Sequence, residues 1–201
     1  SAKNLKLHSD KGIKIDGDLN FINAVSQEDF FLTADLNNVT ADYYRLKDIL
    51  PNLLGKTLPT EFKKLGRFHL SGFTKVTPNA IEATLDIDSE IGMVISDLEI
   101  TDFADIDDAT YSGDIEFIKF DLGRIFEDPL FGEFSFKGEI PEGKGFRLEN
   151  INTTLIGKVS EIEYNKYTYQ DLTVNGTYKN NVFDGKLDIN DVNLKMNFNG
   201  L

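Results

Sequence analysis

The sequence contains no cysteine and no tryptophan, and only two of its 201 residues are histidine. Without cysteine, the chain has no disulfide bond, no thiolate metal site and no cysteine nucleophile. Plentiful phenylalanine without tryptophan favours an apolar lining over a platform for stacking sugars. Catalytic motifs such as Gly-x-Ser-x-Gly, the phosphate-binding loop and His-Glu-x-x-His are also missing. We therefore expect no enzymatic activity, no cofactor and no metal site.

Long apolar runs and an excess of basic residues are also absent. No apolar stretch approaches the roughly 18 residues that a membrane-spanning helix needs. The chain carries 34 acidic against 21 basic residues, a net charge of −13. Such a charge repels phosphate backbones, so we expect no nucleic-acid partner.

Acidic residues are frequent between positions 97 and 114, as they are in a calcium-binding loop. Loops starting at Asp86 or Asp105 fail, because Ile91 takes the required glycine position in the first and Ala109 a ligand position in the second. These acids are better interpreted as a solvated edge of a sheet, where charge guards against unwanted strand pairing.

Strict alternation of apolar and polar residues dominates the sequence. It is clearest at 13–21, 83–88, 172–178, 183–189 and 194–198. This period is typical of half-buried antiparallel strands, and turn signals recur about every eight to twelve residues. The pattern predicts a mainly β fold: an elongated, curled antiparallel sheet with one or two short helices.

Glycines interrupt the alternation at Gly17, Gly157, Gly176 and Gly185. Within strands, glycine permits bends and bulges. A sheet bent at several such points can curl, and we expect this one to form a trough.

A motif of the form Gly-x-Phe-x-apolar-x-Gly occurs twice, at 66–72 and 132–138. Each copy follows a stretch with helical period, at 43–54 and 121–127, and Thr40 or Asp42 is a candidate N-cap of the first helix. Pro51 is expected to kink or shorten that helix and Gly55 to follow its end. We expect both helices to close one end or edge of the sheet. With the strand pattern on both sides, residues 1–201 form one repetitive β segment with helix-containing units near 41–75 and 120–141.

Two interpretations of the apolar strand faces remain open. They could pack against another sheet in a β-sandwich, or line a trough open to acyl chains, where each buried methylene contributes about 0.8 kcal/mol. In the second case the residues lining the groove are Phe68, Leu70, Leu85, Ile87, Ile115, Phe117, Phe134, Phe136, Leu155, Val159, Leu172, Val174, Leu187, Ile189, Met196 and Phe198.

The second half of the chain contains the short helix followed by Gly-Glu-Phe-Ser-Phe-Lys-Gly at 132–138 and the runs 145–157, 169–176 and 191–200. In these features it resembles the AsmA-like superfamily, and most closely its TamB-type translocation and assembly modules. The likeness is best over 120–201. It implies a curled "β-taco" groove in a long periplasmic protein of a Gram-negative bacterium, anchored to the inner membrane outside this segment. The implied roles are phospholipid transfer between inner and outer membranes and assembly of outer-membrane proteins with an Omp85-type barrel.

Three functions are therefore expected, in this order. The first is carriage of phospholipid acyl chains in the groove of an envelope bridge. The second is a chaperone-like module that binds strands of outer-membrane proteins at a sheet edge. The third is a plain β-sandwich interaction domain. A start without Met and an end directly after the strand pattern at 194–198 indicate a segment of a longer protein.

Overall fold

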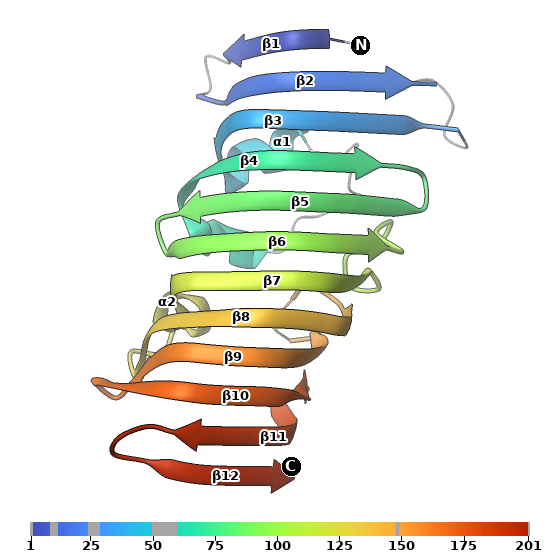
Figure 1. Cartoon of the computed structure of the whole chain (residues 1–201). Coiled ribbons are helices and arrows are strands. Elements are labelled where there is room, and N and C mark those ends of the chain that lie inside the picture. Colours follow the sequence, from blue (N-terminus) through green and yellow to red (C-terminus); the bar gives the residue numbers. More distant parts are fainter. Residues whose placement is uncertain (1, 9–11, 24–28, 50–59, 148, 201) are drawn as a thin grey trace.

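The computed structural model describes residues 2–8, 12–23, 29–49, 60–147 and 149–200. Within them, twelve strands form one antiparallel sheet in which each strand pairs with the next along the chain (Figure 1). The mainly β prediction with a curled antiparallel sheet is confirmed. The β-sandwich alternative is wrong, because the strands form one sheet and there is no second sheet among the described residues to cover its apolar face.

The strands are joined by hairpins or by short helical connections. Their bounds are β1 Ala2–His8, β2 Lys14–Ile22, β3 Phe31–Asp42, β4 Arg67–Val76, β5 Ala80–Ser89, β6 Gly92–Thr101, β7 Thr110–Asp121, β8 Phe131–Lys144, β9 Asn152–Tyr164, β10 Tyr167–Lys179, β11 Val182–Asn190 and β12 Lys195–Gly200.

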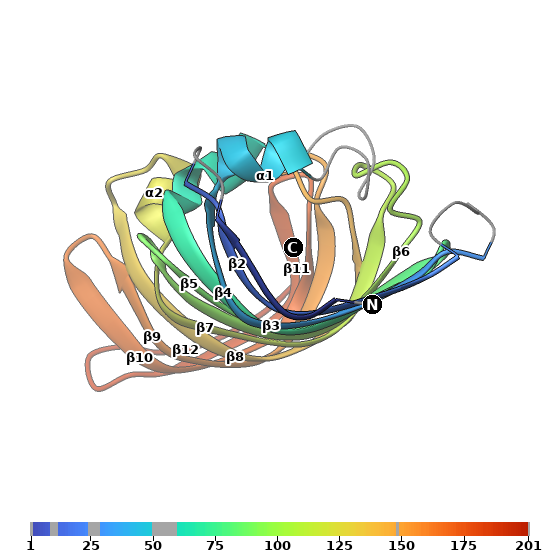
Figure 2. The ribbon, with the colours of Figure 1, turned by 90° about the horizontal axis from the view of Figure 1, so that it is seen from above.

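The strands curve along their length, so the sheet forms a trough with a U-shaped cross-section (Figure 2). Bulges interrupt the ladder at several points, including one between Asp16 and Gly17. A bulge adds local twist and bends the strand, which agrees with the bend expected at Gly17. Gly176 and Gly185 lie opposite each other on β10 and β11.

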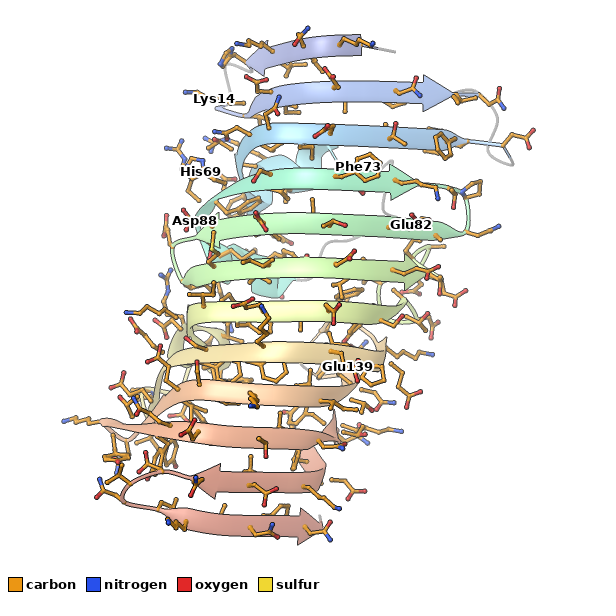
Figure 3. All side chains as sticks on the ribbon, in the orientation of Figure 1. Lys14, His69, Phe73, Glu82, Asp88 and Glu139 are labelled. Carbon is orange, nitrogen blue, oxygen red and sulfur yellow. The ribbon has the colours of Figure 1, made fainter. Side chains whose placement is uncertain are left out.

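The two faces of the sheet differ in polarity. The convex outer face carries exposed residues such as His69, Glu82, Asp88 and Glu139, which are labelled in Figure 3. Phe73 is an apolar exception on this face and is 44% exposed. Side chains between these positions point to the concave inner face, because successive residues of a strand alternate between faces.

Helices α1 (Tyr43–Ile49) and α2 (Leu122–Phe126) lie on the concave side, over the mouth of the trough (Figure 2). They occupy one side of the mouth and not the ends of the sheet at β1 and β12. Of the two N-cap candidates, Thr40 and Asp42, it is Asp42 that caps α1, since its Oδ1 accepts a hydrogen bond from the Arg45 amide at 3.1 Å.

The rest of the predicted first helix, with Pro51 and Gly55, lies outside the described residues. A 3₁₀ helix, η2 (Thr60–Leu65), was not predicted, because six residues are too few to show a helical period. It contacts both α1 and α2. No helix in the described part of the chain has the length and apolar character needed to cross a membrane.

Buried apolar residues gather in two clusters on the inner face. One cluster lies on β3, β4 and β5 around Leu32, Val76 and Ile81. The other lies on β8, β9 and β10 around Phe136 and Val159. The hydrophobic core is therefore the floor of the trough itself.

Candidate functional site

Strand register aligns one apolar side chain from each strand into a continuous line along the inner face, called here the first apolar row. Residues opposite each other in register point to the same face of a sheet. The row consists of Leu7, Ile15, Val39, Leu70, Ile87, Val94, Phe117, Phe136, Val159, Leu172, Ile189 and Met196. With strands about 4.8 Å apart, it is on the order of 50 Å long.

A second row runs beside the first and mixes large apolar residues with glycine and serine. It consists of Leu5, Gly17, Leu36, Gly72, Leu85, Ser96, Ile115, Gly138, Gly157, Val174, Leu187 and Phe198. The paired glycines Gly138 and Gly157 leave space that the ring of Phe136 fills. A methyl group built on Gly157 would lie 2.8 Å from Cε2 of this ring, and one on Gly138 would lie 2.7 Å from its Cζ.

Much of the first apolar row keeps contact with solvent. Only Phe136, Val159 and Leu172 are buried, with exposed fractions of 2%, 6% and 5%. Leu7 and Met196, at the two ends of the row, are 42% and 41% exposed, and the other seven residues are half-buried. The inner face is thus an apolar surface that the rest of the described chain covers incompletely.

The sixteen residues predicted to line a groove all lie on this inner face. Eight belong to the first apolar row and five to the second row, and Phe68, Phe134 and Leu155 lie directly beside them. Phe68 is 2% exposed at the start of β4. Their contact with lipid stays a prediction.

Some residues of these rows were not predicted, among them Val94 of the first row and Leu36 of the second. The register shifts between Leu36 and Val39, where the β3–β4 ladder is irregular. Leu36 and Val39 both point to the inner face although they are three positions apart. Strict alternation puts residues at that spacing on opposite faces, so the sequence pattern could not assign both correctly. For Val94 a signal existed, since Val94, Ser96 and Leu98 alternate in β6.

The repeated motif occupies equivalent places in β4 and β8. Leu70 and Phe136 both belong to the first apolar row, while Gly72 and Gly138 both belong to the second. One repeat therefore corresponds to four strands, and the same residue types line the trough after each repeat.

The predicted acidic sheet edge is wrong, because β6 and β7 each have a paired strand on both sides. Asp97, Glu99 and Asp114 lie on the outer face, and the other four acids lie in the connection between β6 and β7, at 102–108. Asp97 and Asp114 are directly opposite each other on β6 and β7, and Asp114 is opposite Glu139 on β8. In the part of the chain that the structure describes, no three His, Asp or Glu side chains come together in a way that could hold a metal ion. His69 is exposed on this face, as expected, with Nδ1 3.0 Å from Oγ1 of Thr40.

A buried carboxylate holds the last hairpin on the body of the sheet. Asp191 is 4% exposed and accepts hydrogen bonds from the Tyr167 hydroxyl at 2.7 Å, the Asn193 amide at 2.8 Å and the Gln170 amide at 3.0 Å. These bonds, the Tyr167 hydroxyl first, lower the pKa of Asp191. The same contact raises the pKa of Tyr167. This cluster is satisfied internally and serves structure.

Comparison with protein-family models, curated proteins and solved structures found no match to this chain. The apolar inner face is the feature of the described residues that bears most directly on function.

Proposed function

We propose that this chain carries phospholipid acyl chains along the inner face of its curled sheet, as a segment of a TamB-like periplasmic bridge between the inner and outer membranes. The observation that supports this best is the first apolar row, one apolar side chain from every strand, incompletely covered along its length. The setting in a Gram-negative envelope follows the sequence resemblance over 120–201.

The shape and chemistry of the inner face suit an acyl chain. Each methylene that leaves water for an apolar surface contributes about 0.8 kcal/mol, so a long chain gains many such increments. Because apolar residues recur at every strand, movement by one strand spacing replaces one apolar contact with a similar one. A polar head group can stay hydrated at the rim of the trough, so transfer along it needs no chemical step.

Site-specific photocrosslinking tests this proposal. A photoreactive residue at Phe134 or Leu187, both on the inner face, should crosslink to a labelled phospholipid during expression or in vesicle assays. The matched control is Phe73, which lies on the outer face (Figure 3). Equal labelling of the inner and outer positions, or none at the inner positions, would contradict the proposal.

The open edges of the sheet support a second candidate function. Within the described residues, β1 pairs only with β2, and β12 pairs only with β11. An unpaired edge can accept an extended peptide as a further strand. On this alternative, the chain binds strands of outer-membrane proteins and delivers them to an Omp85-type barrel.

A proline in the last strand separates the two candidates. Asn197→Pro in β12 removes a backbone donor and should abolish binding of an outer-membrane strand peptide while lipid crosslinking at Phe134 continues. If Asn197→Pro instead abolished lipid crosslinking and left peptide binding intact, β12 would be needed for lipid carriage and not for strand binding, contrary to this expectation.

A further inference from the structure

A shallow depression of about 440 Å³ lies at the helix-bearing rim, where α1, η2 and the start of β4 meet. It brings together cationic and aromatic side chains from separate parts of the chain. Its lining includes Tyr43, Tyr44, Arg45, Lys63 and Arg67, together with Asp42, Gly66 and Glu90.

The aromatic rings form one wall around a lysine. Tyr43 and Tyr44 stand nearly perpendicular, with ring centroids 5.4 Å apart. The Lys63 ammonium lies 5.3 Å from the first ring centroid and 5.8 Å from the second. Cation–π contact of this kind holds an ammonium group in place without neutralising its charge.

The two carboxylates of the depression have partners, most of them in the depression itself. Asp42 pairs with Arg45, and Glu90 pairs with Arg124 at 3.8 Å and accepts a hydrogen bond from the Arg67 amide at 3.1 Å. Among the described residues, the side chains of Lys63 and Arg67 form no ion pair. The lining therefore carries one more cation than carboxylates, in a chain whose net charge is −13.

This rim directly adjoins the apolar inner face. Arg67 is exposed, while the next residue, Phe68, is 2% exposed on the inner side, and Leu70 of the first apolar row follows two positions later. In Figure 2, α1 lies over the mouth of the same trough. By strand alternation Arg67 has the outer-face parity of His69, so the head group of an amphiphile whose tail lies on the inner face must reach over the rim to contact Arg67.

We propose that Lys63 and Arg67 bind the phosphate of a phospholipid head group while its acyl chains lie along the inner face. Ammonium and guanidinium groups both donate charge-assisted hydrogen bonds to phosphate oxygens. This inference rests on the proposed function, because it assigns the head-group position of the same lipid.

Binding of three probes by the whole chain tests the inference. The probes are a short-chain phosphatidylglycerol, a diacylglycerol with the same acyl chains, and glycerol 3-phosphate. The test variant is the double substitution Lys63→Gln and Arg67→Gln. The charge-matched control is Lys158→Gln with Lys186→Gln, two exposed lysines on the outer face.

We expect the test variant to weaken phosphatidylglycerol binding by about tenfold or more, as loss of charged hydrogen bonds does. Diacylglycerol binding should stay unchanged, and the outer-face control should bind both lipids like the unmodified chain. The exchange Lys63→Arg with Arg67→Lys, which keeps both charges, should retain most of the affinity. Unchanged melting temperatures would show that each variant is folded.

The other outcomes separate the two proposals. If both lipids bind and the test variant lowers neither affinity, the head-group site is wrong and lipid carriage stands. If glycerol 3-phosphate binds as tightly as phosphatidylglycerol and only the test variant loses it, the rim binds free phosphate esters and its assignment to a lipid is wrong. If no probe binds, both proposals fail.

Discussion

At the scale of single residues, Phe136 is the side chain on which the floor of the trough depends most. It is 2% exposed, and its ring covers the glycine pair Gly138 and Gly157. Aromatic rings placed over glycines in neighbouring strands restore the apolar contact that glycine lacks. The ring therefore joins β8 to β9 at the centre of the apolar row.

Phe136→Ala should lower the free energy of unfolding by about 3–5 kcal/mol, because it leaves a cavity above two glycines. Phe73→Ala, on the outer face, should cost about 0.5 kcal/mol or less, as surface changes usually do. Urea denaturation of both variants measures the difference. Similar losses at the two positions would show that the inner face is no better packed than the outer one.

Asp191 makes the stability of the folded chain depend on pH in the acidic range. Its pKa is lowered in the folded chain, so the carboxylate contributes stability above its unfolded pKa and loses that contribution as pH falls toward the folded pKa. Asp191→Asn should lower the melting temperature at pH 7, and the gap to the unmodified chain should narrow below about pH 4.

Asp184→Asn is the control, because Asp184 is exposed on the same hairpin. Its melting temperature should follow that of the unmodified chain throughout the titration. A gap between Asp191→Asn and the unmodified chain that stays constant from pH 7 to pH 3 would mean that the charge of Asp191 is unimportant.

At the scale of elements, cross-strand pairs on the outer face are of both kinds. Lys75 with Glu82 and Lys137 with Glu116 attract, while Asp97 opposite Asp114 and Asp114 opposite Glu139 repel. Like charges directly opposite each other destabilise a sheet. The sheet thus tolerates repulsion between carboxylates on the outer face, because apolar packing on the inner face contributes more to its stability.

Asp114→Lys should raise the melting temperature at low ionic strength, since it places a cation between two carboxylates on neighbouring strands. The gain should shrink in about 1 M salt, where the Debye length is near 3 Å. Asp184→Lys, away from this acidic group, should give a smaller change. No gain at low salt would indicate that a partner already neutralises Asp114.

At the scale of the whole molecule, the single curved layer is the feature that matters for function. Most domains bury a sheet face against a second layer, whereas among the described residues of this chain helices cover one side of the mouth and leave the rest of the inner face without a layer (Figure 2). A large accessible apolar surface marks a binding site for apolar partners.

Adjacent residues of β6 allow a matched test of this view. Val94 belongs to the first apolar row, and Ile95 points to the outer face; both are half-buried. Val94→Asp should strongly reduce the phospholipid that co-purifies with the chain, because a carboxylate on the apolar row must stay hydrated. Ile95→Asp should leave that amount near its original value. Native mass spectrometry with organic extraction measures the bound lipid, and equal lipid in the two variants would contradict an inner-face site.

The sequence alone determined the fold class, the faces of most strands and the helix start at Asp121, and it narrowed the cap of the first helix to Thr40 or Asp42, because these features depend on local alternation and capping. It could not decide between a sandwich and a trough, since both bury alternate residues. Nor could it locate Val39, whose face depends on a bulge. Only the tertiary structure decided that the twelve strands of the described residues form a single layer, and that Lys63 and Arg67 line the same depression at the rim. Register and curvature come from contacts between strands, and such contacts are not encoded in any short stretch of residues.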